Sequence, residues 1–380
     1  MKAFLTSMAL LLCCISNAQV KQEIFESFKL QERRDVRYYF PETYTKEKKY
    51  PLIVVLDAEY LFDQVVANSK VYSTFHGMPE AIVVGVDQNN NAIRLEDCAF
   101  DEISGLPDDK GKKFYEFLGM ELIPYLETSY NTAPFKMFVG YDITASFGNL
   151  FLYKEESLFN AYISISPVLA AEMEERVPAR LAAMKNPVMY HVIVEGEKNK
   201  NTNRIAAMDK GIAAINNEVI TYSYDVYPQA DHISVVTYGI GKSFDNIFSL
   251  FKPISPKEYK EQLLAAEGPV IDYLTSKYSA IEKMFGFKKS VALNDIMATY
   301  AGIRKKEDFE SLKPLSDLCK KEYPDTMMGF YFEGEYYEQL GEPKKALRTF
   351  EKAFGMREID FLTKEMALDK MDALKADFGF

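Results

Sequence analysis

Apolar and polar positions follow two different patterns along this chain of 380 residues. From residue 19 to about residue 252, short β-rich runs alternate with stretches of helical periodicity. Two of the runs, PLIVVL at residues 51–56 and AIVVGV at residues 81–86, are apolar on both faces, which is typical of parallel strands covered by helices. The repeated strand-helix order predicts an α/β fold with one mostly parallel sheet between helices.

The same pattern predicts the other elements of this sheet. Residues 24–40 are expected to form two antiparallel strands closed by Pro41, and residues 110–130 a long helix. Further strands are expected at residues 135–139, 161–166, 188–194 and 220–227. The last of these alternates apolar with polar residues, so we expect it to be half-exposed near an edge of the sheet.

The pattern changes at Lys252-Pro253-Ile254-Ser255-Pro256, where two prolines interrupt the chain. The chain beyond them reads as helical to its end, which places a domain boundary between residues 19–252 and residues 253–380. Within this second part, small and aromatic residues recur at the spacings of a tetratricopeptide repeat: Phe330, Gly334, Tyr337, Gly341, Ala346, Phe350 and Ala353. Small residues let two antiparallel helices approach closely, so we expect a repeat-like helical pair here and a weaker pair at residues 291–323.

Residues 1–18, MKAFLTSMALLLCCISNA, carry one basic residue, a short apolar run and a small-x-small ending. This arrangement predicts a secretory signal peptide and therefore export to the periplasm, the cell surface or the medium. No later stretch approaches the roughly 20 apolar residues that spanning a bilayer requires.

Charge and cysteine content bear on which partners and cofactors are expected. The net charge is −11, and removal of Lys2 with the signal makes it −12, so nucleic acid is not an expected partner. The two remaining cysteines, Cys98 and Cys319, lie far apart, and no Cys/His spacing indicates a zinc site. We expect no metal and no cofactor.

The strand at residues 135–139 ends in Gly140-Tyr141-Asp142, and a helical stretch follows at once. An α/β-hydrolase carries its nucleophile on such a turn, where small neighbours relieve the crowding. Residues 137–167 resemble the bacterial esterase family that includes enterochelin-type esterases, whose turn reads Gly-His-Ser-x-Gly-Gly. In that register Asp142 stands in place of the serine, Tyr141 in place of the histidine and Thr144 in place of a glycine.

The resemblance covers about the first 250 residues and implies the α/β-hydrolase fold for them. Residues 50–62 resemble the family's oxyanion-loop segment, with Ala58 where a glycine is usual, so the backbone amides of Ala58 and Ile143 are the implied oxyanion donors. The implied base is His232, which follows the last strand in a His-x-Ser motif, and the implied acid is Glu197. His76 and His191 fit ordinary surface or packing positions better.

A carboxylate at the turn has three interpretations. It can displace a leaving group from saturated carbon or open an epoxide, although the chain lacks the tryptophans that typically bind a released halide. Against an ester carbonyl, its attack gives a mixed anhydride. In the structural interpretation, Asp142 caps the following helix, a contact worth roughly 0.5 to 2 kcal/mol.

Ser146 is a second candidate nucleophile, because it fits a loose small-x-Ser-x-Gly pattern. Using it would move the turn four residues into the helix.

These observations predict an exported, catalytically degenerate hydrolase-fold protein that acts as a binding or scaffold protein of the cell envelope. The alternative is an active hydrolase that uses Asp142 or a residual esterase mechanism, with His232 as base. Two repeats cannot bury a free-standing solenoid face. The helical part is therefore expected to pack on the hydrolase domain or to contact an envelope protein or peptide.

Overall fold

The computed structural model describes residues 20–88, 90–196 and 201–379. The expected signal peptide and Glu197 lie outside these ranges. The chain divides into two compact units: the first runs to Phe251 and includes Met284–Gly286, and the second comprises Lys252–Lys283 and Phe287–Phe380. No helix in the described ranges is long and apolar enough to cross a membrane.

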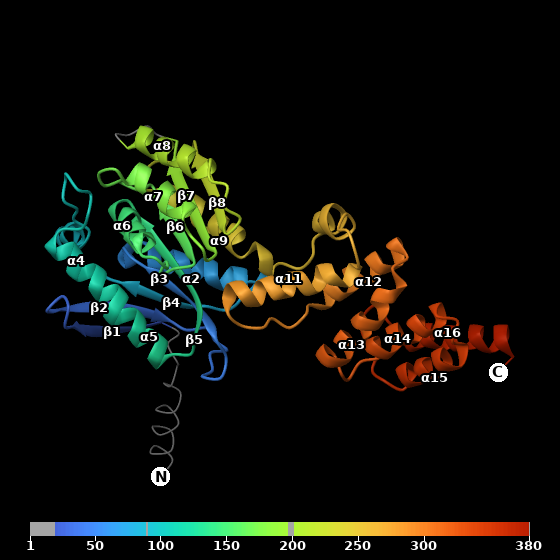
Figure 1. Cartoon of the computed structure of the whole chain (residues 1–380). Coiled ribbons are helices and arrows are strands. Elements are labelled where there is room, and N and C mark those ends of the chain that lie inside the picture. Colours follow the sequence, from blue (N-terminus) through green and yellow to red (C-terminus); the bar gives the residue numbers. More distant parts are fainter. Residues whose placement is uncertain (1–19, 89, 197–200, 380) are drawn as a thin grey trace, which may run out of the picture. The chain divides into compact units, whose positions relative to one another are not determined.

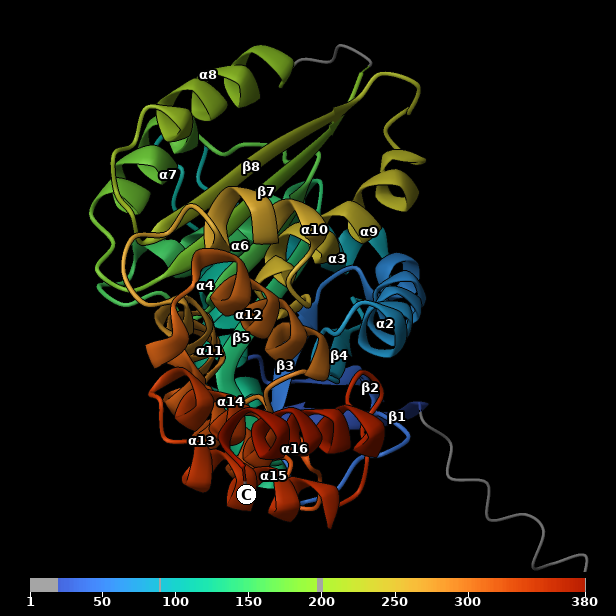
Figure 2. The ribbon, with the colours of Figure 1, turned by 90° about the vertical axis from the view of Figure 1, so that its right-hand side faces the viewer.

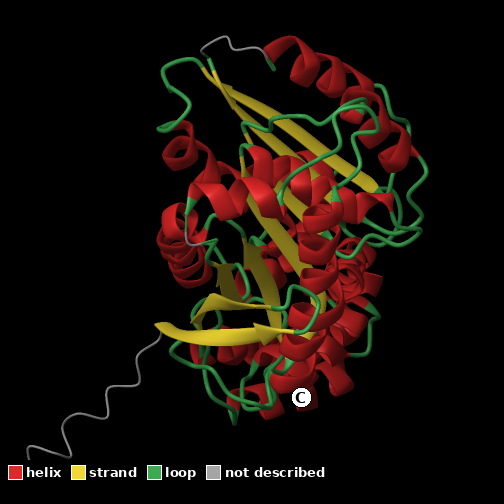
Figure 3. Cartoon of the chain, turned by 90° about the vertical axis from the view of Figure 1, so that its left-hand side faces the viewer, coloured by secondary structure: helices red, strands yellow, loops and turns green. Residues whose placement is uncertain are grey.

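The first unit contains one eight-stranded sheet, with the order β1-β2-β4-β3-β5-β6-β7-β8 (Figures 1 and 3). Its strands are β1 (Val20–Ser27), β2 (Glu32–Tyr39), β3 (Tyr50–Val55), β4 (Ile82–Val86), β5 (Thr132–Tyr141), β6 (Ala161–Ile165), β7 (Val188–Glu195) and β8 (Ile220–Tyr227). β1 pairs antiparallel with β2, and β2 antiparallel with β4, whereas the other neighbours are parallel. The mostly parallel sheet confirms the α/β-hydrolase-like fold that was predicted.

The helices of this unit are α2 (Ala58–Phe75), α3 (Asn91–Asp97), α4 (Asp109–Glu116), α5 (Ile123–Ser129), α6 (Ile143–Gly148), α7 (Met173–Ala182), α8 (Thr202–Ala213) and α9 (Val235–Ile247). Short turns of other helix types lie at η1 (Phe117–Leu122), η2 (Asn149–Tyr153) and η3 (Ser249–Phe251). One core joins Leu52, Val54 and Phe138 of the sheet to residues of α4 through α8. α2 and α9 pack side by side (Figure 2), and they meet the sheet where Phe62 approaches Gly85 and where Gly239 approaches Ile193. Helices therefore cover both faces, which explains why β3, β4, β6 and β7 are buried throughout.

The long helix expected at residues 110–130 is interrupted by a π-helical segment, η1. Asp108 begins the helical run, because its side chain accepts a hydrogen bond from the Gly111 amide at 2.8 Å. Pro124 has no N–H to donate to the carbonyl of Met120, and the Ile123 amide bonds the Leu118 carbonyl, five residues back. The proline therefore accounts for the wider turn before α5.

The second unit is helical. Its elements are α10 (Pro256–Glu258), η4 (Tyr259–Leu263), α11 (Val270–Phe285, except its last two residues), α12 (Leu293–Lys306), η5 (Phe309–Ser311), α13 (Leu312–Glu322), α14 (Met328–Gln339), α15 (Pro343–Phe354) and α16 (Lys364–Phe378). α14 and α15 pack together around Ala346 and Phe350, which are fully buried. The helical pair was predicted from small residues at these spacings; its classification as a tetratricopeptide repeat stays a prediction.

Gly334 is the contact point of this pair. A Cβ added there would lie 2.7 Å from the Phe350 ring, closer than side-chain carbons come without displacement. We expect Gly334→Val to lower the free energy of unfolding of the helical unit by about 1–3 kcal/mol through overpacking. Gly355→Val is the matched control, because a Cβ at Gly355 would be 3.4 Å from its nearest neighbour. Equal stability of the two variants in urea denaturation would contradict the close approach.

Candidate functional site

Asp142 occupies the apex of the turn between β5 and α6. Its backbone torsions are φ 58° and ψ −119°, a strained conformation that costs about 1–3 kcal/mol and is concentrated at functional sites. A Cβ on Gly140 would lie 2.8 Å from backbone atoms of Thr144 and Ala145. The turn therefore requires glycine at position 140, and the elbow geometry is retained although the serine is not.

The Asp142 carboxylate pairs with Arg94. Its Oδ2 atom lies 3.1 Å from Nη1 of Arg94, a residue of α3. The side chain of Asp142 makes no capping hydrogen bond to α6, so the prediction that it caps this helix is wrong. Capping needs an extended backbone at the first position, and Asp142 has a positive φ instead. The guanidinium also offers a charge-assisted bond, which is stronger than a bond to a neutral amide.

Arg94 joins two carboxylates. Its Nη2 atom donates to Oδ2 of Asp57 at 3.1 Å and to the Tyr141 carbonyl at 3.0 Å, and its Nε atom donates to Oδ1 of Asp57. Asp57 is only 1% exposed, and this burial raises its pKa even though Arg94 and Thr144 oppose the shift. Burial alone would lower the pKa of Arg94, but the two carboxylates outweigh it and raise that pKa.

Thr144, which stands where the family has a glycine, supports the same cluster. Its hydroxyl lies 2.7 Å from Oδ2 of Asp57 and 2.8 Å from the Tyr141 carbonyl, and it accepts a hydrogen bond from the Tyr141 amide at 2.8 Å. The side chain is fully buried. The departure from glycine thus gives Asp57 a further polar partner and ties the elbow to the segment that precedes α2.

His232 has a carboxylate partner, Glu195. Its Nδ1 atom lies 3.1 Å from Oε1 of Glu195, and Ser166 donates to the other carboxylate oxygen. Glu195 ends β7 and has a side chain only 4% exposed. Burial would raise the pKa of Glu195, but hydrogen bonds from Ser166 and His232 lower it. The expected acid, Glu197, lies outside the described residues, and Glu195 is a carboxylate partner that was not predicted from the sequence.

Tyr141 positions the segment that carries His232, the expected base. Its hydroxyl donates to the His232 carbonyl at 2.9 Å, and the two rings have centroids 5.0 Å apart. The His232 side chain is 43% exposed. Within the described ranges, Arg94 is the residue that bonds the Asp142 carboxylate, and no hydrogen bond joins that carboxylate to His232.

The expected oxyanion donors lie at the starts of two helices. Ala58 is the first residue of α2 and Ile143 the first of α6. The strands that precede them, β3 and β5, are paired neighbours, with Val55 opposite Val139. Amides at the first helical position have no partner inside their helix. The two N–H groups therefore lack partners inside their own helices, as oxyanion donors require, although Ala58 itself is only 1% exposed.

The other polar candidates lie elsewhere. Ser146 is fully buried in α6, and its hydroxyl has no hydrogen-bond partner among the described residues, so the apex belongs to Asp142. His76 is exposed at the end of α2 against Tyr72. His191 is buried in β7, with Nε2 2.8 Å from Oδ2 of Asp225. Within the described residues, no group of three or more His, Cys, Asp or Glu side chains is arranged to hold a metal ion.

His191 gives the first unit a pH-dependent stability. Burial and Lys242 lower the pKa of His191, although Asp225 opposes the shift. The unfolded chain therefore takes up a proton near the ordinary value of about 6.5, at a higher pH than the folded protein does, and stability falls as the pH drops below that value. We expect a smaller loss between pH 7.5 and pH 5.5 for His191→Gln than for the wild type in urea denaturation. His76→Gln is the control; a loss equal in both variants would exclude His191 as the source.

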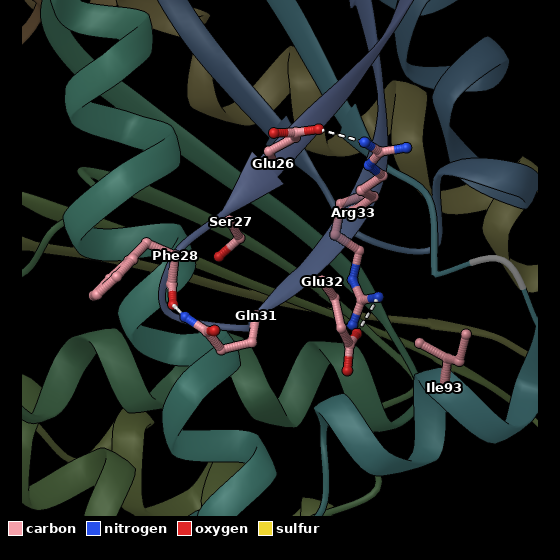
Figure 4. Close-up of a pocket in the computed structure, with 8 residues that line it drawn as sticks. Glu26, Ser27, Phe28, Gln31, Glu32, Arg33 and Ile93 are labelled. Carbon is pink, nitrogen blue, oxygen red and sulfur yellow. Dashed lines mark hydrogen bonds and ion pairs between the residues drawn. The ribbon is translucent and has the colours of Figure 1, made fainter.

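A hollow of about 830 Å³ lies beside the turn between β1 and β2 (Figure 4). It is lined by Glu26, Ser27, Phe28, Gln31, Glu32, Arg33, Arg34 and Ile93. Its arginines are engaged within the lining, Arg33 with Glu26 and Arg34 with Glu32, both at 2.7 Å. The lining contains none of the elbow, base or acid residues, so this hollow is separate from the candidate site.

Comparisons with known proteins agree with the fold. The model of a family described as "Putative esterase" matches residues 27–232. The solved structure of an uncharacterised protein from Capnocytophaga ochracea is 34% identical, with a TM-score of 0.86, and the match covers 94% of this chain and 100% of that one. No curated protein matches the chain.

Two more distant structures show the fold alone. An IroE-like serine hydrolase from Shewanella oneidensis is 19% identical, with a TM-score of 0.58, and the match covers 80% of this chain and 99% of that one. The BES protein from Bacillus cereus is 18% identical, with a TM-score of 0.53, and the match covers 61% and 96% of the two chains.

Proposed function

The chain belongs to this esterase family, and we propose that it is a member that binds a ligand without hydrolysing an ester. The observation that carries the proposal is the ion pair between Asp142 and Arg94 at the nucleophile position, 3.1 Å between the charged atoms. A serine hydroxyl would be activated there by a base, whereas the charge of a carboxylate paired with a guanidinium is partly compensated, which makes it a weaker nucleophile.

Charge at the apex also opposes ester hydrolysis. Attack on an ester carbonyl develops negative charge on the carbonyl oxygen, which oxyanion donors normally stabilise. Asp142 precedes Ile143 directly, so its own negative charge lies next to the place where that charge would develop. The product of carboxylate attack would be a mixed anhydride, which is less stable than the ester. Both effects act against turnover.

The retained pair of His232 and Glu195 favours one alternative, an aspartate-nucleophile hydrolase. Such an enzyme forms an alkyl ester on the aspartate, and a histidine-activated water then cleaves it. Glu195 holds Nδ1 of His232 at 3.1 Å, which leaves Nε2 for that water. The ion pair with Arg94 weakens Asp142 as a nucleophile, and for this reason we rank binding above this reaction.

Ester hydrolysis by the wild type and by His232→Ala tests the proposal. We expect the full chain to hydrolyse p-nitrophenyl acetate no faster than His232→Ala, because no activated hydroxyl is available for the base to serve. Wild-type turnover that disappears in His232→Ala would contradict the proposal and indicate an active hydrolase.

We further propose that the protein is exported and acts in the cell envelope, with the helical unit as the contact for an envelope protein or peptide. Residues 1–18 support export, since they have the charge and apolar pattern of a signal peptide. The packed pair α14 and α15 supports a contact role, because its small and aromatic residues recur at the spacings of repeats that present concave binding surfaces when they stack. Fractionation of cells that express the chain with and without residues 1–18 tests export; equal cytoplasmic retention would contradict it.

A further inference from the structure

One oxygen of the Asp142 carboxylate is available to a ligand. Oδ2 accepts the hydrogen bond from Arg94, and no other described residue bonds this carboxylate. The side chain is 21% exposed, so a ligand can reach it. A carboxylate has about four acceptor positions on its two oxygens, and most of them are open here.

Hydrogen-bond donors lie beside this acceptor. The Ile143 amide directly follows Asp142 in the chain. The Ala58 amide follows Asp57, which shares the Arg94 guanidinium with Asp142. The hydroxyl of Thr144 is engaged with Asp57 and Tyr141, so it does not compete for Asp142. The apex therefore offers one anionic acceptor and, at the starts of α6 and α2, two neutral N–H donors.

This combination selects among ligand groups. An ester can fill the donors with its carbonyl oxygen, but it has no hydrogen to give the carboxylate, whose charge would face ester lone pairs. An ammonium group can bond the carboxylate, but it would meet two N–H dipoles of the same sign. A carboxamide satisfies both sides, since its carbonyl accepts and its N–H donates. Sites that hydrogen-bond a ligand N–H discriminate strongly against analogues that lack it.

We propose that the elbow binds a primary carboxamide, which has an N–H on the same side as its carbonyl, with the ligand N–H on Asp142 and the ligand carbonyl on the amides of Ile143 and Ala58. This inference rests on the proposed non-hydrolytic function and specifies its ligand class. The replacement of serine by aspartate then changes the site from one that attacks a carbonyl carbon to one that holds an amide.

Four related probes test the ligand class on the full chain: phenylacetamide, N,N-dimethylphenylacetamide, methyl phenylacetate and phenethylammonium. Dissociation constants come from NMR titration. We expect phenylacetamide to bind at least about tenfold more tightly than the other three, the effect of one hydrogen bond to a charged acceptor. Asp142→Ala should remove the preference and Asp142→Asn, which keeps an acceptor oxygen, should reduce it. Asp109→Ala, at a fully exposed side chain, should leave it unchanged.

Three results would overturn the inference. Equal affinities for phenylacetamide and its dimethyl derivative, tighter binding of phenethylammonium, or no binding of phenylacetamide would each exclude an amide site. Melting temperatures of the variants separate lost binding from lost folding. A separate measurement tests the proposed non-hydrolytic function: release of phenylacetate from methyl phenylacetate that depends on His232 would contradict it. The comparison of the two amides would still report on the ligand class.

Discussion

Replacing Arg94 by methionine should lower the free energy of unfolding of the first unit by about 3–5 kcal/mol. Asp57 is 1% exposed and bonds two nitrogen atoms of this guanidinium. Without Arg94, the folded protein must either bury an unpaired carboxylate or protonate it, and both cost free energy. Urea denaturation followed by circular dichroism measures the change.

Two further variants distinguish the loss of this buried charge pair from the stability cost of removing any arginine. Arg33→Met removes an exposed guanidinium, 74% accessible and paired with Glu26, and should cost less than about 1 kcal/mol. The double variant Arg94→Met with Asp57→Asn should recover part of the loss, because the buried charge is gone. If Arg94→Met were as stable as Arg33→Met, the proposed charge cluster would not hold the elbow.

Asp142→Ser should gain ester hydrolysis that depends on His232. The strained apex, the Glu195–His232 pair and the amides of Ala58 and Ile143 are all in place, and Arg94 keeps Asp57 as its partner. A positioned general base contributes about 10²–10⁴-fold, so we expect initial rates on p-nitrophenyl acetate to exceed the wild-type rate by about that factor.

The gain must disappear in Asp142→Ser with His232→Ala and must survive in Asp142→Ser with Ser146→Ala. The second comparison matters because Ser146 is fully buried in α6 and should not act as nucleophile. A gain that needed Ser146, or no gain in a variant that folds normally, would show that the elbow no longer supports a serine mechanism.

The sheet could be predicted from the sequence because its strands carry their own signal. Runs such as residues 51–56 are apolar at successive positions, as burial between two layers of helices requires. The elbow also carries a local signal: a glycine, Gly140, directly follows the strand, and the turn there is too crowded for a Cβ. Features that depend on neighbouring residues in the chain can therefore be predicted from the sequence.

Arg94 could not be predicted, because its role depends on residues far away in the chain. It lies in the short polar helix α3, 37 residues from Asp57 and 48 from Asp142, and no local spacing connects them. This missing partner also explains the wrong capping prediction for Asp142, since a local rule assigned the carboxylate to the nearest amides. One signal in the sequence could have identified Glu195: it is a charged residue at the end of a mostly apolar, buried strand.

Labelling with a fluorophosphonate, followed by intact-mass analysis, tests the central claim most directly, since the reagent reacts with activated serine hydroxyls. We predict that the folded wild-type chain stays unlabelled under conditions in which Asp142→Ser takes up one phosphonyl group at position 142. Stoichiometric labelling of the wild type at any serine would show that a working nucleophile exists, and would contradict an elbow whose nucleophile position is held by the Asp142–Arg94 ion pair.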